Sequence, residues 1–349
     1  MQWDAIEHDL RKPALWSFAT GHGAREDLPT RIALLLDAVA GSGFGKPTAR
    51  FQTFESLRQR VPTDVWNEVL DMHALLTGWF EDEPVFHRVG YLVAIGVSFN
   101  ELVTAARGKR KSELRALLDG RIRQELDLSR EELESLSYEK SSQGCLRVLL
   151  LMNVLATERA NERYPFHRHA EEAWTLEHIH AQHSEGLSKA EQWGSWIDEH
   201  RRALERLADE RSGPERAVCD ALIDELQSSR EHLDGQRFRE LFAKVTRYFT
   251  AEGDDATSTH SLSNLALLAG TDNSALNNAV FEVKRQKLLE LDRRGSFIPL
   301  CTRKVFMKYF EGATAHQVHF WGPADRASYL NAIEETLRPY LLEEVRHAQ

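Results

Sequence analysis

The stretch Trp174-Thr-Leu-Glu-His-Ile-His-Ala-Gln182 decides how the C-terminal half of this chain folds. Its opening residues are aromatic, apolar and β-branched, which predicts a β-strand, and Tyr164-Pro-Phe166 shortly before it has a similar character. A second strand is predicted at Ser263-Asn-Leu-Ala-Leu-Leu-Ala-Gly270, an apolar run that stops at a glycine. Two strand signals therefore bracket a long intervening segment.

Helical patterns occupy the chain between and after these strands. Three helix-like stretches, 188–206, 214–230 and 236–250, lie between the strands, and a basic helix over 281–292 follows the second strand. Trp193 and Trp196 lie three residues apart on the first of these helices, so we expect them to pack in a core.

The residues before the strands are predicted to be helical almost throughout. Arg31-Ile-Ala-Leu-Leu-Leu-Asp-Ala-Val39 repeats apolar residues with helical spacing and is closed by Gly41. Further helices are expected over 91–106, 111–126 and 144–161.

We therefore expect a mainly α protein in three parts. The first part is a helical domain over 1–163. The second is a mixed region over 164–323 that contains a helical insertion, 187–252. The third is a C-terminal helix over 324–349, with Pro323 as its start signal.

The composition argues against a membrane partner and against secretion. In 349 residues no apolar run approaches the roughly 18 residues of a membrane span, so no membrane partner is expected. The first residues lack the pattern of a secretory signal. The three cysteines, Cys145, Cys219 and Cys301, are too far apart for a zinc knuckle or a disulfide framework. We therefore expect a reducing, cytoplasmic location.

The charge balance restricts how the chain could bind nucleic acid. Lys and Arg number 44 against 54 Asp and Glu, a net charge of -10, which argues against a broad basic face. Segment 281–308 is an exception, because eight basic residues face three acidic ones there, a net charge of +5. Any phosphate site must therefore be local, although a solvated helix face would explain the same charges.

Candidate catalytic chemistry concentrates at the end of the first strand. Glu177 offers carboxylate oxygens of the kind that Mg²⁺ prefers, and the imidazole of His178 can accept a proton from water near neutral pH. Asn273, with its amide oxygen, stands ahead of the basic helix. Together these groups are suited to metal-assisted hydrolysis of a phosphodiester.

The joint pattern resembles a known nuclease family. Glu177-His-Ile-x-x-Gln182, then Asn264-Leu-x-Leu-Leu268, then Asn273-Ser-x-Leu-x-Asn-x-x-Phe-x-x-Lys284 is similar to the HNH (His-Me finger) domain of GmrSD-type (SspE-like) modification-dependent restriction endonucleases. Weaker likenesses, such as Trp79-Phe-Glu-Asp82 and Phe320-Trp321, extend along nearly the whole chain. The resemblance implies a ββα-metal fold and a DNA endonuclease of an antiphage restriction system.

The resemblance also implies a role for individual residues. Glu177 and Asn273 would hold one Mg²⁺ or Mn²⁺ ion, and His178 would be the general base. Asn264 would brace the loop and orient the histidine. DNA phosphate contacts are expected from three further residues, namely Lys284, His180 and Arg285.

Three features depart from the family pattern. Ala181 stands where many members have proline, and 85 residues separate His178 from Asn264, which requires the helical insertion. Family members usually begin with a ParB-like sensor and nucleotide-hydrolysing module, which is expected here as a separate or missing partner. Asp234-Gly-Gln-Arg237 echoes the motif of that module but is expected to be a turn between helices.

Two other functions remain open at this stage. A helical interaction or regulatory module of a defence complex, with an inert HNH core, would explain the acidic charge and the missing sensor. An RNase is the second alternative, because a phosphodiester site of this kind reads the backbone rather than the base edges.

Overall fold

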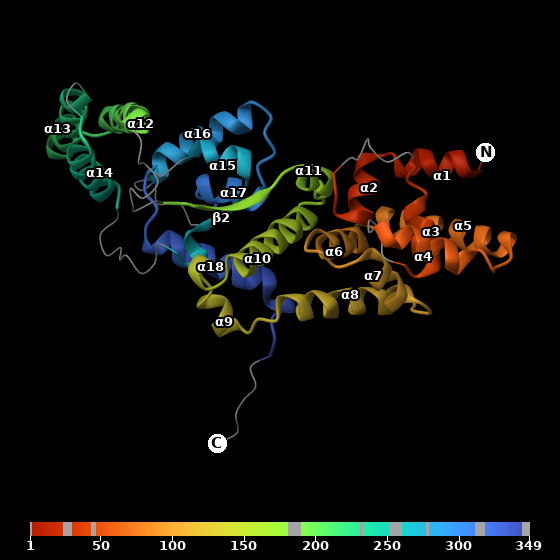
Figure 1. The fold of residues 1–349 in the computed structure, drawn as a ribbon. Helices are drawn as coiled ribbons and strands as arrows, with labels where there is room; N and C mark the ends of the chain where they lie inside the picture. Colours follow the sequence, from red (N-terminus) through yellow and green to blue (C-terminus); the bar gives the residue numbers. More distant parts are fainter. Residues whose placement is uncertain are drawn as a thin grey trace, which may run out of the picture. The chain divides into compact units, whose positions relative to one another are not determined.

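The computed structural model describes residues 2–23, 30–42, 47–180, 190–230, 233–250, 260–276, 279–310 and 318–343, apart from the side chains of 47–49, 190–191 and 273–275. Over these residues the protein is mainly helical, with one two-stranded sheet (Figure 1). None of the described helices combines the length and the apolar character that a bilayer span requires.

The chain forms two compact units that alternate along the sequence. The first unit contains residues 1–129, 153–173 and 339–349, and the second contains 130–152 and 174–338. Helix α10 (Tyr138–Arg159) begins in the second unit and ends in the first. This division differs from the three consecutive parts, 1–163, 164–323 and 324–349, that we expected.

The first unit is helical over its described residues. An aromatic group lies at its centre, where Phe18 stacks on Phe86 with ring centroids 5.4 Å apart and meets Phe99 edge-on at 6.3 Å. The elements of this unit are α1 (Gln2–Leu10), α2 (Pro13–Thr20), α3 (Ala33–Ala40), α4 (Pro47–Leu57), α5 (Pro62–Glu81), α6 (Glu83–Ala94), α7 (Phe99–Ala106), α8 (Lys111–Leu126) and α11 (Phe166–Glu171).

Two predictions for the first unit are wrong. The single helix expected over 91–106 is broken, because Gly96 takes φ +100° and the Val97 N–H bonds to the Leu92 carbonyl in a C-terminal cap. The strand expected at Tyr164–Phe166 is absent, since Phe166 opens α11 and its ring packs on α6. A Cβ at Gly90 would lie 2.2 Å from that ring, so the close packing requires glycine there.

The second unit holds the sheet and the helices that surround it. Its elements are α9 (Arg130–Glu134), β1 (Trp174–His178), α12 (Ala190–Asp209), α13 (Gly213–Ser229), α14 (Gly235–Phe249), the 3-10 turn η3 (Leu262–Asn264), β2 (Leu265–Ala269), α15 (Gly270–Leu276), α16 (Phe281–Arg293), α17 (Leu300–Phe306) and α18 (Pro323–Leu337). A second 3-10 turn, η4 (Arg338–Tyr340), follows α18. The C-terminal helix expected over 324–349 ends at Leu337 and passes into this 3-10 turn, where Pro339 has no N–H to donate to a helical hydrogen bond.

The two predicted strands pair as an antiparallel sheet. Glu177 lies opposite Ala266 and His178 opposite Leu265, and every residue of β2 is buried. An isolated bridge between Ser137 and Ser261 adds to this end of the sheet, and there the Tyr138 N–H bonds to the His260 carbonyl at 2.8 Å. The start of α10 is thereby fixed beside the entry to β2.

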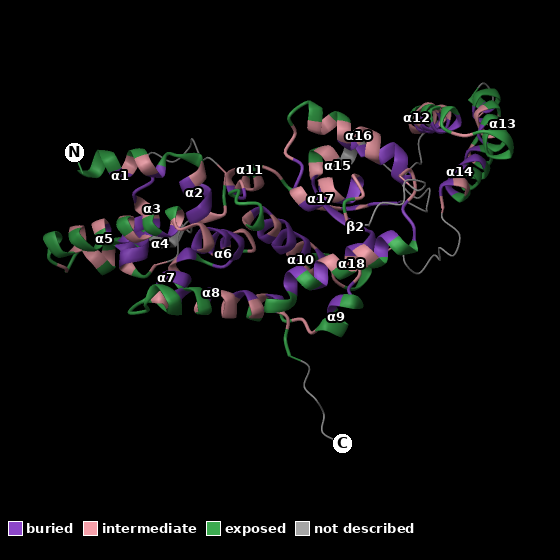
Figure 2. Ribbon diagram, turned by 180° about the vertical axis from the view of Figure 1, so that it is seen from behind, coloured by how far each residue is buried: buried purple, intermediate pink, exposed green. Residues whose placement is uncertain are grey.

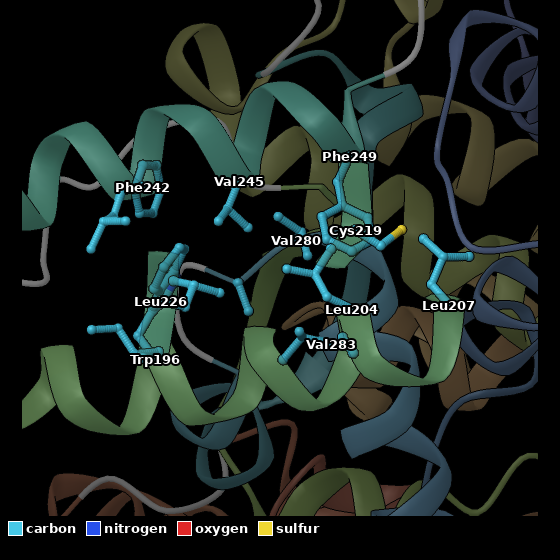
Figure 3. Close-up of a cluster of buried hydrophobic side chains, with 14 of the residues drawn as sticks. Trp196, Leu204, Leu207, Cys219, Leu226, Phe242, Val245, Phe249, Val280 and Val283 are labelled. Carbon is cyan, nitrogen blue, oxygen red and sulfur yellow. The ribbon is translucent and has the colours of Figure 1, made fainter. Parts of the chain in front are cut away.

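The insertion forms three helices, as predicted. Helices α12, α13 and α14 enclose a buried apolar cluster that includes Trp196, Leu204 and Phe242 (Figure 3). Val280 and Val283 of the α16 region belong to the same cluster, so the insertion packs on the start of α16. Asp234 caps α14 by accepting the N–H groups of residues 236 and 237, which confirms the turn predicted there.

Two buried imidazoles accept hydrogen bonds from the backbone N–H groups at the start of α16. The Val280 N–H donates to Nε2 of His200 and the Phe281 N–H donates to Nδ1 of His180, each at 3.3 Å. These backbone groups are among the four N–H groups that a helix leaves without internal partners. Figure 2 shows that α16 is buried at this end and more exposed farther along. The end of β1 and the insertion therefore meet at one helix terminus.

His200 gives a test of this arrangement. Its Nδ1 bonds to the Trp196 carbonyl at 2.7 Å, and the residue is fully buried. We expect His200→Ala to lower the free energy of unfolding by about 3 kcal/mol, since it leaves a cavity and a buried N–H without a partner. His200→Gln, which keeps a donor and an acceptor, should lose less. Urea unfolding at pH 7.5 measures both.

The same residue makes stability depend on pH. Burial lowers the pKa of His200 to about 3, against roughly 6.5 in an unfolded chain. The neutral ring therefore stabilises the fold fully above pH ~6.5, and the contribution falls by about 1.4 kcal/mol per pH unit below that. Unfolding free energies of wild type and His200→Gln should converge between pH 6.5 and 4.5. If the two free energies change in parallel with pH, His200 does not cause the pH dependence.

Candidate active site

A buried ion pair joins β1 to α16. Glu177 is 7% exposed, and its Oε1 pairs with Nζ of Lys284, a side chain that is 1% exposed. The same ammonium donates to the His178 carbonyl at 2.5 Å. Burial raises the pKa of the Glu177 carboxyl above its ordinary value, and the Lys284 charge opposes that rise by favouring the ionised form.

Asn264 clamps the backbone that follows β1. Its Oδ1 accepts the His180 N–H at 3.1 Å, and its Nδ2 donates to the His180 carbonyl at 3.0 Å. The Ile179 N–H adds a bond of 2.8 Å to the Asn264 carbonyl. Both polar atoms of the amide are thus used by one peptide segment. This is the geometry that a brace requires, and it leaves the side chain unsuited to bind a metal ion.

His180 points into the interior of the second unit. It is 1% exposed, and its Nδ1 accepts the backbone N–H at the start of α16. A DNA phosphate contact, the role expected from the sequence, would require the ring to leave this position. The same holds for the ammonium of Lys284, which is already held by Glu177.

His178 faces a different set of neighbours. Successive strand residues point to opposite faces, so His178 turns away from the side of Glu177. Its Nε2 lies 3.1 Å from Nδ1 of His260, and the Tyr138 ring is 5.4 Å away between centroids. Burial, with the Lys284 charge and the His260 ring, lowers the pKa of His178 to about 4, so the imidazole is neutral at pH 7.

Three residues beside His178 were not predicted from the sequence. Tyr138 and His260 flank its ring, and Oε1 of Glu139 lies 3.5 Å from Nε2 of His260. Tyr138 is 42% exposed, and the Glu139 side chain is 71% exposed, so this side of the site reaches solvent. These residues carry no motif, because the bridge between Ser137 and Ser261 that gathers them forms only in the fold.

Of the remaining predicted residues, Arg285 lies away from Glu177, and the side chain of Asn273 is not among the described residues. Asn273 is in α15, and its side chain is outside the described residues. Arg285 turns toward Glu282 on its own helix, at 3.4 Å, rather than toward Glu177. The structure therefore gathers Glu177, Lys284 and the backbone of His178 directly, whereas Arg285 faces another surface.

Metal binding at this site stays a prediction. Among the described side chains no group of three or more His, Cys, Asp or Glu is arranged to hold a metal ion. The ligands expected here, one carboxylate and one asparagine, would not form such a group.

Nothing matches this chain in comparisons with family models, curated proteins and solved structures.

The Asn264 clamp can be tested through stability. We expect Asn264→Ala to lower the free energy of unfolding by about 2–4 kcal/mol, because it leaves the buried N–H and C=O of His180 without partners. Asn331→Ala, at an exposed position of α18 in the same unit, is the matched control and should change it by less than about 0.5 kcal/mol. Equal, small effects would show that the clamp is unimportant. Guanidinium unfolding measures both variants.

Proposed function

We propose that the second unit is a metal-dependent DNA endonuclease with His178 as its general base. The observation that carries the proposal is a neutral imidazole on the strand residue next to a buried carboxylate, with both residues tied to the following helix by Lys284. The antiparallel β1–β2 pair followed by α15 and α16 agrees with the ββα order expected for an HNH site.

The neighbours of His178 favour one protonation pattern. Oε1 of Glu139 lies 3.5 Å from Nε2 of His260, and a carboxylate oxygen accepts hydrogen bonds, which favours the His260 tautomer with its proton on Nε2. Nδ1 of His260 then accepts from Nε2 of His178. The lone pair of His178 is thereby placed on Nδ1, which has no hydrogen-bond partner among the described residues. That atom takes the proton from the attacking water.

Lys284 acts on both functional groups. Its charge favours the ionised form of Glu177, against the effect of burial, and adds to the effect of burial in favouring the neutral form of His178. Its bond to the His178 carbonyl holds the strand end against α16. These effects favour a carboxylate that can bind a cation and, in the next residue, an imidazole that can accept a proton.

Glu177 fits a role as ligand to a divalent ion. A buried carboxylate that already attracts a cation has the charge and the oxygen atoms that Mg²⁺ or Mn²⁺ selects. Glu177 and Asn273 would hold the ion, which would neutralise charge on the phosphate and on the leaving oxygen. The residues of this chain supply the proton acceptor and the fixed geometry around it.

The biological setting follows from the motif resemblance alone. We propose an effector nuclease of an antiphage restriction system that works with a separate ParB-like sensor module. The net charge of -10 supports dependence on such a partner for substrate capture, since it argues against a broad basic face.

Cleavage assays test the general base. With Mg²⁺ or Mn²⁺ and supercoiled plasmid, we expect His178→Ala to lower kcat/KM by about 10²–10⁴-fold, because a positioned general base contributes that much. His8→Ala, at an exposed histidine of α1, should match wild type. Equal cutting by wild type and His178→Ala would refute the assignment. Faster cutting of a matched RNA would make the protein an RNase.

His260 is expected to act as a positioning residue. His260→Ala should lower kcat by about tenfold with KM unchanged, because His178 loses the acceptor that fixes its tautomer. His260→Asn, whose Oδ1 can accept the same proton, should restore most of kcat. If both variants lower kcat equally, or if KM rises instead, His260 has no such role.

A further inference from the structure

A cavity of about 300 Å³ lies in the second unit beside α16. The end of α12 forms one wall, and α16 and residues 318–319 form the others. Its charged lining consists of Arg206, Glu210, Arg211, Glu282, Arg285 and His319.

The two carboxylates of the cavity, Glu210 and Glu282, contact basic and polar side chains of the same cavity. His319 lies between them, with Nε2 at 2.9 Å from Glu210 and Nδ1 at 3.0 Å from Glu282. Hydrogen bonding to these carboxylates raises the pKa of His319, which favours its charged form. Gln286 and Arg285 also contact Glu282, at 2.8 and 3.4 Å. A bound molecule therefore meets little free negative charge.

Basic groups predominate in the cavity lining. Three guanidinium groups face two carboxylates, and those carboxylates favour the charged form of the His319 imidazole between them. Glu215 pairs with Arg211 at 2.8 Å from outside the lining and offsets its charge. Arg206 forms no ion pair within the described part of the chain, and it is exposed. This local excess contrasts with the net charge of -10 for the protein.

The place of the cavity on α16 connects it to the candidate active site. Lys284 turns to Glu177, and the next residue, Arg285, lines the cavity, about 100° farther around the helix axis. A volume near 300 Å³ is at the lower end of ligand pockets, which suits one phosphate with part of its sugar. Guanidinium groups match the fork of phosphate oxygens.

We propose that this cavity binds a backbone phosphate of the nucleic acid strand that is cut at His178, with Arg206 and Arg285 as its main contacts. The inference rests on the proposed nuclease function and adds the anchoring subsite for its substrate. The site is sequence-independent, because phosphate contacts position a strand without reading its bases.

A DNA-binding assay without metal tests this phosphate subsite independently of DNA cleavage. The probe is a fluorescein-labelled 20-base-pair duplex in EDTA, and its anisotropy is measured with the His178→Ala protein from 50 to 200 mM KCl. We expect Arg206→Glu to weaken binding about tenfold and to reduce the salt slope by about 1, as the loss of one phosphate contact requires. Arg216→Glu, at an exposed arginine of α13 that pairs with Asp220, has the same change in charge and should stay within twofold.

The outcomes distinguish this inference from the function it rests on. In the active protein, Arg206→Glu should raise KM for plasmid nicking and leave kcat unchanged. If wild type nicks but Arg206→Glu alters neither affinity nor KM, or weakens binding no more than Arg216→Glu, the subsite is refuted and the nuclease stands. If the duplex binds through Arg206 but is never cut, the nuclease fails and the subsite stands. If the His178→Ala protein binds no duplex, the subsite is refuted, and the nuclease is decided by plasmid nicking alone.

Discussion

The buried pair of Glu177 and Lys284 is the constraint on which the candidate site depends. It fixes β1 against α16, and the Lys284 ammonium also holds the backbone of His178. The backbone N–H groups at the start of α16 donate hydrogen bonds to His180, which follows the sheet strand β1, and to His200 of the insertion. The sheet and the insertion therefore both contact the start of this helix. Removing one member would leave an uncompensated buried charge, which typically costs 3–5 kcal/mol.

Stability alone does not explain such a pair. Apolar residues of similar volume often replace a buried ion pair without loss of stability. A functional role gives a reason for the charges, since Lys284 favours the ionised form of Glu177 and, together with burial, the neutral form of His178. A divalent ion bound by Glu177 would share that carboxylate with Lys284, so metal affinity and the ion pair are coupled. The cavity at Arg206 adds positive charge on another side of α16.

Local patterns predicted much of the fold but little of the surroundings of His178. The two strands, the three insertion helices and the turn at Asp234 follow from spacing and capping residues, which act over a few positions. The motif placed Asn264 where its amide clamps the chain after β1. Tyr138 and His260 could not be predicted, because a bridge between segments distant in sequence brings them together. The inward turn of His180 likewise depends on where α16 begins.

Calorimetric titration with Mn²⁺ tests whether Glu177 holds a divalent ion. The informative pair is Lys284→Met, which keeps the Glu177 carboxylate, and the double variant Glu177→Gln with Lys284→Met, which leaves no unpaired buried charge. Circular dichroism checks whether both variants are folded. We expect wild type and Lys284→Met to bind one Mn²⁺ ion each and the double variant to bind none. Absence of binding to wild type, or equal binding by both variants, would contradict a metal-dependent nuclease at Glu177 and favour an inert helical module.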